Sequence, residues 1–390
     1  MEMHKEVIVK IREESRKPVR VAWLFPSLAR GYYWQPVFKE FTRYLPETTI
    51  FTGLWPGFAH GYENAFQVRT LSGVRFVTLK RRHDGASGGY VRTPLSILAE
   101  LGKFKPDVVF TNGFHGFTVC VLLLRLIRGI RVVIFWEGNA PNSLGTSRIR
   151  AITRRLISRM ADAAVSNAEE GIQYLRQLGV PDDRVFCHPC EVPEISLLCS
   201  GEESAPFSGL RHPVFLYVGS IIPRKGWRHL IDAASLLVRQ GFKQFSVVLA
   251  GGGAQEDELR SAIRENRLER IVHPVGSVPY HKLGAYYRDA DVFVSPTRED
   301  TWGVAVLEGM AFGKAVLCSK YAGSRQMITH GEDGFIFDPY NTSELAECMK
   351  RFIVDPDSAA RVGQRAREKM MQFTAARAAS VLAKVALEPA

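Results

Sequence analysis

The sequence predicts an α/β protein with two domains, each a Rossmann-like parallel sheet covered by helices on both faces. The chain has 390 residues, of which 46% are apolar, and this length exceeds that of a usual single domain. Apolar runs of strand length recur without polar alternation, and amphipathic stretches separate them, which is typical of parallel sheets. A turn-rich segment from Leu198 to Gly209 interrupts this rhythm and indicates a connection between domains.

The first half of the chain contains four strand-like runs that end in polar or glycine-containing loops. They begin at Arg20, Asp107, Arg131 and Asp162. A helix is expected over Val37–Leu45. The most apolar stretch, Phe117 to Trp136, is interrupted by arginines and therefore predicts a buried helix followed by a strand rather than a membrane span. We expect an N-terminal domain over residues 1–195 and a linker over 196–212.

The second half repeats the pattern and predicts a further domain over residues 213–372. The expected strands are Val214–Val218, Ser246–Ala250, Ile271–Val275, Val292–Pro296 and Ala315–Cys318. The expected helices are Trp227–Gln240, Glu256–Glu265, Lys282–Arg288, Val304–Phe312 and Ser343–Phe352. The tail from Ala359 to Leu387 is expected to be helical throughout, and residues 373–390 to pack back on the N-terminal domain. Open sheets of this kind bind ligands at the carboxyl ends of their strands, so a central cleft is expected.

Composition narrows the class of protein. Met1 to Lys17 lacks the apolar core of a secretory signal, and six cysteines do not make a disulfide scaffold, so a cytoplasmic location is expected. Cys187 and Cys190 have the spacing of half a zinc site, but a second ligand pair is missing, so no metal is predicted. Residues 1–200 hold 27 Lys and Arg against 18 Asp and Glu, which indicates an acidic partner for the N-terminal domain.

Two segments carry the chemistry. In Tyr217 to Gly226 an apolar strand runs into a glycine-bounded loop with two adjacent bases, and a helix follows. Such a loop offers backbone amides and cations to a phosphate group, although many loops of this kind carry a merely solvated Arg-Lys pair. The second segment runs from Asp291 to Gly313 and ends in an apolar helix. Glu308 is the lone carboxylate of this helix, and a buried carboxylate needs a partner. The two hydroxyls of a ribose would serve, as would a neighbouring lysine or a backbone amide.

The order of several motifs resembles the retaining glycosyltransferases of family 4, which have the GT-B architecture. The motifs span Gly219–Gly226, Val248–Gly253, Val275–Pro279, Asp289–Pro296, Asp300–Val316, Gly323 and Gly331–Phe335. The resemblance implies that Lys225 binds the donor diphosphate, Glu308 binds the donor ribose and Asp300 contacts the transferred sugar. It also implies donor contacts along the chain at Gly219, Ser220, Val275, Gly276, Thr301, Trp302, Gly303 and Val304.

The chain departs from the family pattern at three places. Asp300 replaces the first glutamate of the family motif, so Glu299 beside it is a further candidate. Ser220 stands where many members carry an arginine, and we expect Arg224 to supply that charge. The histidine near the end of the fourth strand is absent, which leaves Glu137 and His115 as candidates for its role; for His115 an ordinary hydrogen-bonded histidine is an equal alternative.

The expected activity is retaining, metal-independent transfer of a sugar from a nucleoside-diphosphate sugar to a hydroxyl of a glycan or lipid-linked acceptor. No cofactor and no nucleic-acid partner are expected. Asp289-Ala-Asp291 resembles a metal-holding pair but lies at a helix-to-strand junction, where Asp is a common turn residue. Two alternatives stay open: a catalytically silent nucleotide-sugar-binding protein, and a dinucleotide-dependent oxidoreductase suggested by Gly251–Gly253, although the full glycine spacing is absent.

A basic segment, Arg148–Met160, is amphipathic, with Ile149, Ile152, Leu156 and Ile157 on or near one face. A solvated helix covering the sheet explains it, and so does a peripheral contact with anionic lipid that brings a lipid-linked acceptor to the protein. The second reading places the protein on the inner face of the plasma membrane.

Overall fold

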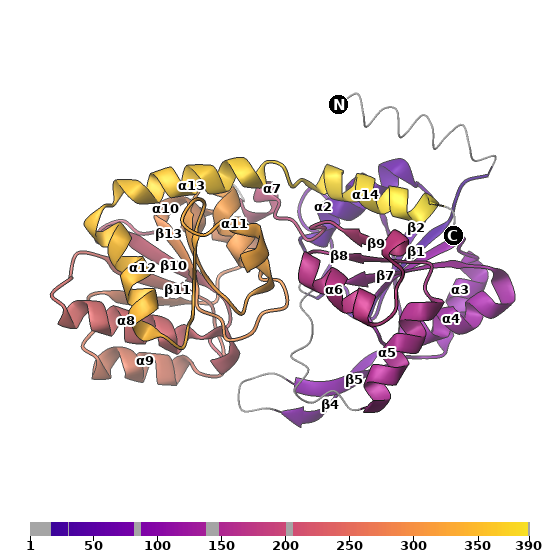
Figure 1. Ribbon diagram of the computed structural model, residues 1–390, viewed down its shortest axis with the longest axis horizontal. Helices are drawn as coiled ribbons and strands as arrows, with labels where there is room; N and C mark the ends of the chain where they lie inside the picture. Colours follow the sequence, from indigo (N-terminus) through magenta and orange to yellow (C-terminus); the bar gives the residue numbers. More distant parts are fainter. Residues whose placement is uncertain (1–16, 30, 82–86, 138–147, 200–205, 389–390) are drawn as a thin grey trace. The chain divides into compact units, whose positions relative to one another are not determined.

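The computed structural model describes residues 17–29, 31–81, 87–137, 148–199 and 206–388. These residues form two compact units (Figure 1). Unit one consists of Met1–Lys80, Gly88–Val192 and Ala375–Ala390, and unit two is built mainly from Pro193–Thr374. Both are layered α/β structures, as predicted.

Unit one is organised around a seven-stranded sheet in which every described strand pair is parallel. The strand order is β3-β2-β1-β6-β7-β8-β9. The strands are β1 (Val21–Phe25), β2 (Thr48–Thr52), β3 (Gln67–Thr70), β6 (Val108–Asn112), β7 (Arg131–Trp136), β8 (Ala163–Ser166) and β9 (Val185–Cys187). A separate two-stranded sheet pairs β4 (Arg75–Arg81) with β5 (Ser87–Arg92). The central strands β1, β6 and β7 are buried except at the ends of β6 and β7, which explains their unalternated apolar sequences.

The two faces of this sheet are covered differently. One face carries an aromatic core in which Trp23 of β1 stacks on Phe110 of β6 with ring centroids 4.1 Å apart. The helices α2 (Trp34–Tyr44) and α14 (Ala375–Leu387) pack against each other, and the Arg131 guanidinium of β7 donates to the Val385 carbonyl of α14. The C-terminal helix therefore belongs to unit one. An aliphatic core on the sheet joins α3 (Ser96–Phe104), α4 (Gly116–Arg128), α5 (Arg148–Met160) and α6 (Glu169–Gln177).

Unit two contains a six-stranded parallel sheet in the order β12-β11-β10-β13-β14-β15. Its strands are β10 (Val214–Val218), β11 (Ser246–Ala250), β12 (Val272–Gly276), β13 (Val292–Ser295), β14 (Ala315–Ser319) and β15 (Phe335–Phe337). Its helices are α7 (Ile195–Leu198), α8 (Trp227–Arg239), α9 (Glu256–Glu265), α10 (Leu283–Asp289), α11 (Val304–Ala311), α12 (Thr342–Val354) and α13 (Asp357–Met370). The predicted elements of this half agree with these bounds to within a residue or two.

Three expectations need correction or restriction. The tail is not one helix, because α13 ends at Met370 and α14 begins at Ala375, where the chain passes from unit two to unit one. The predicted linker 196–212 includes part of α7 and the buried Phe207, so this segment packs on unit two; residues 200–205 lie outside the described part. The α4 helix is not fully buried, since Leu126 and Ile127 are 72% and 82% exposed.

Candidate functional site

Unit two has a topological switch point between β10 and β13. The chain leaves β10 toward β11 and β12 on one side and then returns to β13 on the other side. The loops that follow these two neighbouring strands therefore start at the same edge of the sheet and diverge, which is where open parallel sheets bind ligands. Residues 219–226 form the first loop and residues 296–303 form the second, and these are the segments that the sequence marks for donor binding.

Backbone hydrogen bonds hold the two loops together. The Arg224 carbonyl accepts from the Arg298 amide at 2.8 Å and from the Thr297 hydroxyl at 3.0 Å. In the opposite direction, the Arg224 guanidinium donates to the Glu299 carbonyl at 2.6 Å. The position of the basic pair is thus determined by the acidic loop that follows β13. The Glu299 carboxylate itself lies on an exposed residue.

Gly226 permits this close approach. Its φ of +68° lies in the left-handed region, and a Cβ placed there would lie 1.9 Å from the Pro296 carbonyl oxygen. Any side chain would push the loop after β10 away from the end of β13. The glycine that ends the basic loop is therefore a structural requirement of the site.

At the junction of the loops, Lys225 forms an ion pair with Asp300. The ammonium nitrogen lies 2.5 Å from the carboxylate Oδ2, and the side chains are 23% and 16% exposed. The Arg224 guanidinium lies 3.9 Å from Oδ1 of the same carboxylate. Three of the predicted site residues, from segments 75 residues apart in the chain, are therefore brought together.

The turn after Asp300 leads directly into α11. Gly303 has a φ of +90° at the N-cap, and no side chain caps the helix. The loop after β14 supports the turn, because the Ser324 amide donates to the Trp302 carbonyl at 2.7 Å. Trp302 is buried, whereas Thr301 is exposed. The unsatisfied amides and partial positive charge of the first helical turn, at Val304, thus lie close in sequence to the ion pair.

Glu308 lies one turn further along α11 and is only 3% exposed. Its two carboxylate oxygens accept hydrogen bonds from different tyrosines, Tyr280 at 2.9 Å and Tyr287 at 2.7 Å. Burial raises the pKa of this carboxyl group, and the two tyrosine hydrogen bonds act against that shift. The hydroxyls thus provide the partners that a buried carboxylate needs, in place of the lysine or backbone amide considered from the sequence.

Sequence reasoning missed these two tyrosines. Tyr280 begins the 3-10 turn before the short helix α10, Tyr287 lies within α10, and their spacing of seven residues corresponds to two helical turns. That spacing is a signal that both point to one side, but nothing in the sequence indicates that the side faces Glu308.

The other predicted donor positions lie along the same sheet edge. Gly219 follows β10, and its amide donates to the Ala250 carbonyl at 3.0 Å. The Ser220 carbonyl accepts from the buried Tyr217 hydroxyl at 2.8 Å. Val275 and Gly276 end β12, and Val275 is 42% exposed. The structure therefore places these four residues at or beside the ends of β10 and β12.

Unit one carries a different cluster at its strand ends. Asn112 ends β6, Glu137 follows β7 and Asn167 follows β8, so three neighbouring parallel strands each contribute one polar side chain. The Asn112 amide donates to Oε1 of Glu137, and the Asn167 amide donates at 2.8 Å to Oε2 of Glu191, which follows β9. The charge of Glu137 acts on the Glu191 carboxyl group.

Each of two neighbouring carboxylates disfavours ionisation of the other, because like charges repel. Burial raises the pKa of Glu137, and burial together with the charge of Glu137 raises the pKa of Glu191 well above its ordinary value. Burial also lowers the pKa of His115 to about 4, so this imidazole is neutral at pH 7 and supplies no compensating charge. The sequence prediction named Glu137 and His115 but missed Glu191, whose proximity to Glu137 depends on strand order.

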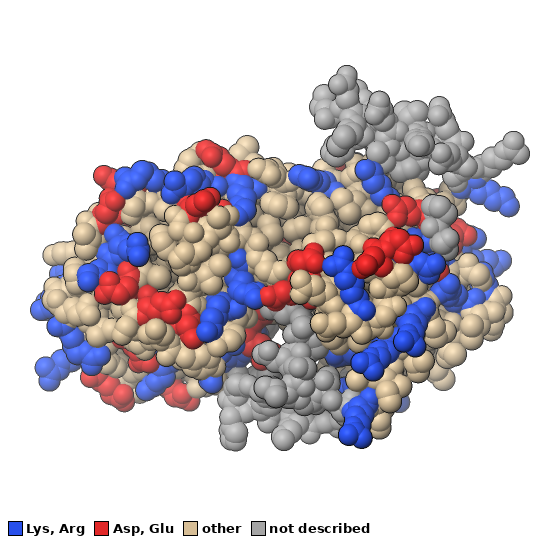
Figure 2. All heavy atoms as spheres, in the orientation of Figure 1, with Lys and Arg blue, Asp and Glu red and all other residues tan. Residues whose placement is uncertain are grey.

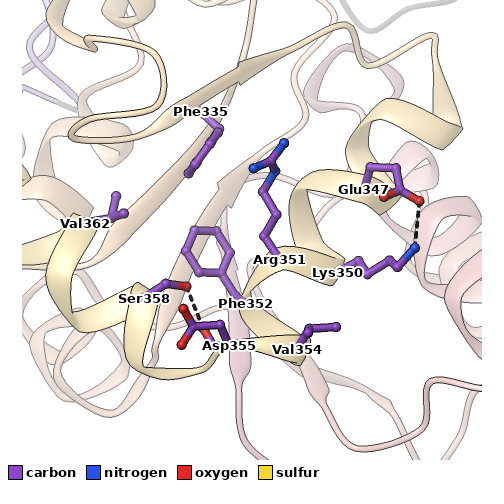
Figure 3. A pocket seen from close by; sticks show the side chains of 9 residues that line it. All are labelled: Phe335, Glu347, Lys350, Arg351, Phe352, Val354, Asp355, Ser358 and Val362. Carbon is purple, nitrogen blue, oxygen red and sulfur yellow. Dashed lines mark hydrogen bonds and ion pairs between the residues drawn. The ribbon is translucent and has the colours of Figure 1, made fainter.

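Two cavities in unit two lie away from the predicted residues. One, of about 390 Å³, is lined by β15, α12 and α13 (Figure 3). Its charged side chains already have partners, since Lys350 pairs with Glu347 and the Arg351 guanidinium lies over the Phe335 ring. The other, of about 280 Å³, is lined in part by Gly226, Trp227 and Arg298. Neither contains Lys225, Asp300 or Glu308.

The two metal-like motifs have other contacts. The Asp289 carboxylate accepts from the Phe207 amide at 3.0 Å, and Asp291 accepts from the Val214 amide at 2.6 Å, so both stabilise local backbone. Cys190 is buried and Cys187 is exposed. Across the part of the chain that the structure describes, no group of three or more His, Cys, Asp or Glu is arranged to hold a metal ion.

Comparison with known proteins agrees with this geometry. The family model of the glycosyl transferases group 1 matches residues 203–369, and that of the glycosyl transferase 4-like domain matches residues 46–191. A Streptomyces kanamyceticus alpha-D-kanosaminyltransferase is 28% identical over 40% of this chain and 40% of its own length. A putative colanic acid biosynthesis glycosyltransferase, WcaL of Salmonella typhimurium, is 32% identical over 51% of this chain and 49% of its own. The alignments thus span about two fifths to one half of these relatives.

Among solved structures, the crystal structure of Anabaena HepE in complex with UDP matches with a TM-score of 0.73. It covers 94% of this chain and 99% of its own length at 17% sequence identity, so this likeness supports the fold alone. Together the two family models account for the strand-end motifs of unit two and for most of the sheet of unit one. The chain therefore belongs to the group 1, family 4-like glycosyltransferases with the GT-B fold.

Proposed function

We propose that this protein is a retaining, metal-independent glycosyltransferase that moves a sugar from a nucleoside-diphosphate sugar to a hydroxyl acceptor. The observation that carries the proposal is the pair of joined loops at the switch point of unit two. They hold Lys225 and Arg224 within 4 Å of Asp300, next in sequence to the uncapped start of α11. Cations and helix amides concentrated at one point suit a diphosphate.

In the proposed reaction, the acceptor oxygen forms a bond to the anomeric carbon while the bond from that carbon to the diphosphate oxygen breaks on the same face. Negative charge develops on the departing diphosphate, which takes up the acceptor proton. Lys225, Arg224 and the first amides of α11 stabilise that charge. Such preorganised groups are often the largest catalytic contribution, with one donor contributing roughly 3–4 kcal/mol.

We assign roles in donor binding to the two acidic residues of unit two, Asp300 and Glu308. Asp300 neutralises Lys225 in the unliganded protein, so the donor diphosphate replaces a carboxylate as the partner of the ammonium group while Asp300 contacts the transferred sugar. Each carboxylate oxygen of Glu308 accepts one tyrosine hydrogen bond and retains capacity for a second from a ribose hydroxyl. Glu137, with Glu191 beside it, and His115 remain candidates for polar contacts to the reacting sugars.

The related proteins suggest the substrates. HepE was crystallised with UDP, which supports a uridine-containing donor, and WcaL belongs to colanic acid biosynthesis, which supports a polysaccharide intermediate as the acceptor. A lipid-linked intermediate is the form of acceptor that accords with a basic unit one. A cytoplasmic location at the inner face of the plasma membrane is part of the proposal.

A catalytically silent nucleotide-sugar-binding protein is the second candidate, and Asp300 and Ser220 are the departures that favour it. The oxidoreductase alternative rests on the glycine run Gly251–Gly253. This support weakens because close packing alone requires a glycine at position 251. A Cβ at Gly251 would lie 1.8 Å from the Gly219 carbonyl oxygen, so the residue lets the loops after β10 and β11 approach each other.

A thermal-shift screen of nucleotide sugars will identify the donor, because a ligand bound by the native state raises the melting temperature. With that donor, hydrolysis or transfer is expected in the wild type and should disappear in Lys225→Ala and Glu308→Ala. Lys243→Ala, at an exposed lysine of the same unit, is the matched control and should keep full activity.

Three results would count against the proposal. Full activity in folded Lys225→Ala would remove the site assignment, and donor binding without turnover would favour the silent binding protein. An inverted anomeric configuration in the product, determined by nuclear magnetic resonance, would exclude the retaining mechanism. Loss of activity in a chelator, restored by a divalent cation, would exclude metal independence.

A further inference from the structure

Two neighbouring helices of unit one, α4 and α5, expose large apolar side chains to solvent. On α4 the exposed set is Val119, Leu123, Leu126 and Ile127, with exposed fractions from 40% to 82%. On α5 it is Ile149, Ile152, Leu156 and Met160, with exposed fractions from 38% to 76%. The spacing along each helix follows the helical period, so each set forms a stripe on one face.

The two stripes point away from the same sheet. Phe117 and Val121 of α4 and Ile157 of α5 belong to one aliphatic core, so both helices cover one face of the sheet. The α4 and α5 helices are in contact, and their C-terminal ends are joined by the Arg125 guanidinium, which donates to the Met160 carbonyl and to Asp162 at 2.6 Å. Residues that face solvent on both helices therefore lie on the outer side of one two-helix layer (Figure 1).

The charge around this layer is of one sign. The α4 helix contains two arginines, α5 contains five, and neither contains an Asp or Glu. Figure 2 shows Lys and Arg atoms interspersed with uncharged atoms on the part of unit one where Figure 1 places the two helices. Five of the arginines are exposed, namely Arg128, Arg148, Arg150, Arg155 and Arg159. We call the eight exposed apolar residues and these five arginines the α4–α5 ridge.

We propose that the α4–α5 ridge docks on the surface of an anionic lipid bilayer, with its aliphatic side chains in the acyl boundary and its arginines among the lipid phosphates. The sequence suggests a peripheral lipid contact through Arg148–Met160 alone. The ridge defines the surface that makes this contact, and it also includes α4, which the sequence predicts to be buried. The apolar stripe of α5 extends for about 16 Å at 1.5 Å per residue, a length suited to lying in the plane of the interface. No helix in the described ranges is both long enough and apolar enough to cross a membrane.

Charge and shape favour lipid over the other partners. In a symmetric contact between two copies, the same surface meets itself, so five exposed arginines would face five others with no Asp or Glu in α4 or α5. A nucleic acid would satisfy the arginines but leave the isoleucines and leucines in water. An anionic bilayer offers both phosphates and hydrocarbon, and each Arg near its surface strengthens binding by about fivefold.

The test is co-sedimentation of the full chain with vesicles of phosphatidylcholine alone or with 30% phosphatidylglycerol. The wild type should sediment with the anionic vesicles only, and less so at high salt. The variant Leu126→Ser/Ile127→Ser/Ile149→Ser/Ile152→Ser should bind at least tenfold more weakly. Val354→Ser/Met371→Ser, which removes two exposed apolar side chains of unit two, should bind as the wild type does.

A second variant, Arg148→Gln/Arg155→Gln, tests the electrostatic contribution to vesicle binding. It should lower both the affinity for anionic vesicles and the salt dependence of that affinity. Equal binding of wild type to both vesicle types, or an equal loss in the unit two variant, would overturn the proposal. So would a ridge variant that keeps vesicle binding but becomes monomeric from a wild-type oligomer in light scattering. Donor-induced thermal shifts should be unchanged in every ridge variant, so failure here is distinguishable from failure of the proposed transfer.

Discussion

The two units present the carboxyl ends of parallel strands, yet they use this edge in opposite ways. In unit two, Lys225 and Asp300 place opposite charges 2.5 Å apart on side chains that remain partly exposed. In unit one, Glu137 and Glu191 bring two acidic groups together, and burial raises the pKa of both. The same sheet geometry therefore gives an ion pair that a charged ligand can replace, and a pair of like groups that responds to pH.

The contrast indicates a division of roles. An ion pair at partial exposure is weak, so exchanging a carboxylate for a diphosphate requires little reorganisation. A buried carboxyl pair is costly to ionise fully, and its protonation state depends strongly on what approaches it. Four predictions probe the contrast, beginning with the largest expected effect.

Lys225→Met should lower the transfer rate by about 100-fold or more, since one preorganised charge on the departing group is removed. Steady-state kinetics with the donor found by thermal shift measures this effect. Glu137→Gln, in the other unit, should change the rate by less and alter the dependence on acceptor concentration instead. If Glu137→Gln lowered the transfer rate more than Lys225→Met does, the main catalytic contribution would lie at the strand ends of unit one and not of unit two.

Gly226→Ala should destabilise unit two by about 2 kcal/mol, through a strained left-handed residue and a clash with the Pro296 carbonyl. Donor binding should be lost with it, because the loop that carries Lys225 must move. Gly241→Ala is the matched control: its φ is +93°, but nothing lies within 4 Å of the added Cβ. Equal effects of the two substitutions in thermal unfolding would show that backbone strain alone matters and that the loop junction does not.

Glu191→Gln should stabilise unit one at pH 8 by about 1–2 kcal/mol and much less at pH 5. The folded-state pKa of Glu191 is raised above the ordinary Glu value of about 4.3, so the native state binds more protons and stability falls as pH rises through this window. The Gln amide carries no charge at either pH. Unfolding at the two pH values, with exposed Glu47→Gln as control, measures the difference; a uniform destabilisation by Glu191→Gln would contradict the raised pKa of Glu191.

Asp300→Asn should tighten binding of free UDP by about fivefold, near 1 kcal/mol, because the carboxylate that competes for Lys225 is neutralised. Transfer should become slower in the same variant, since Asp300 is assigned to the transferred sugar. Calorimetric titration measures the first effect, and exposed Asp257→Asn provides the comparison. Weaker UDP binding in Asp300→Asn would mean that the carboxylate positions Lys225 rather than competing for it.

The candidate site of unit two was predictable to a large extent. Lys225, Asp300 and Glu308 lie in segments whose strand, loop and helix are set by local composition, and the motif order indicates their relation. The partners of Glu308 were not predictable, because Tyr280 and Tyr287 belong to another element whose packing depends on the whole sheet. Glu191 was missed for the same reason, since it follows β9, two strands away from β7 in the sheet.

The sequence by itself determined that the protein has two parallel α/β layers, where most of their strands lie, and which loop carries the basic pair. These features follow from short-range patterns of apolar, polar and glycine residues. Only the tertiary structure decided that Gly226 approaches Pro296, that the charge of Glu137 acts on Glu191, and that the apolar residues of α4 face solvent. Hydrophobic periodicity indicates which residues share one face of a helix, but it does not indicate what packs against that face. The packing partners come from elements that are distant in the chain.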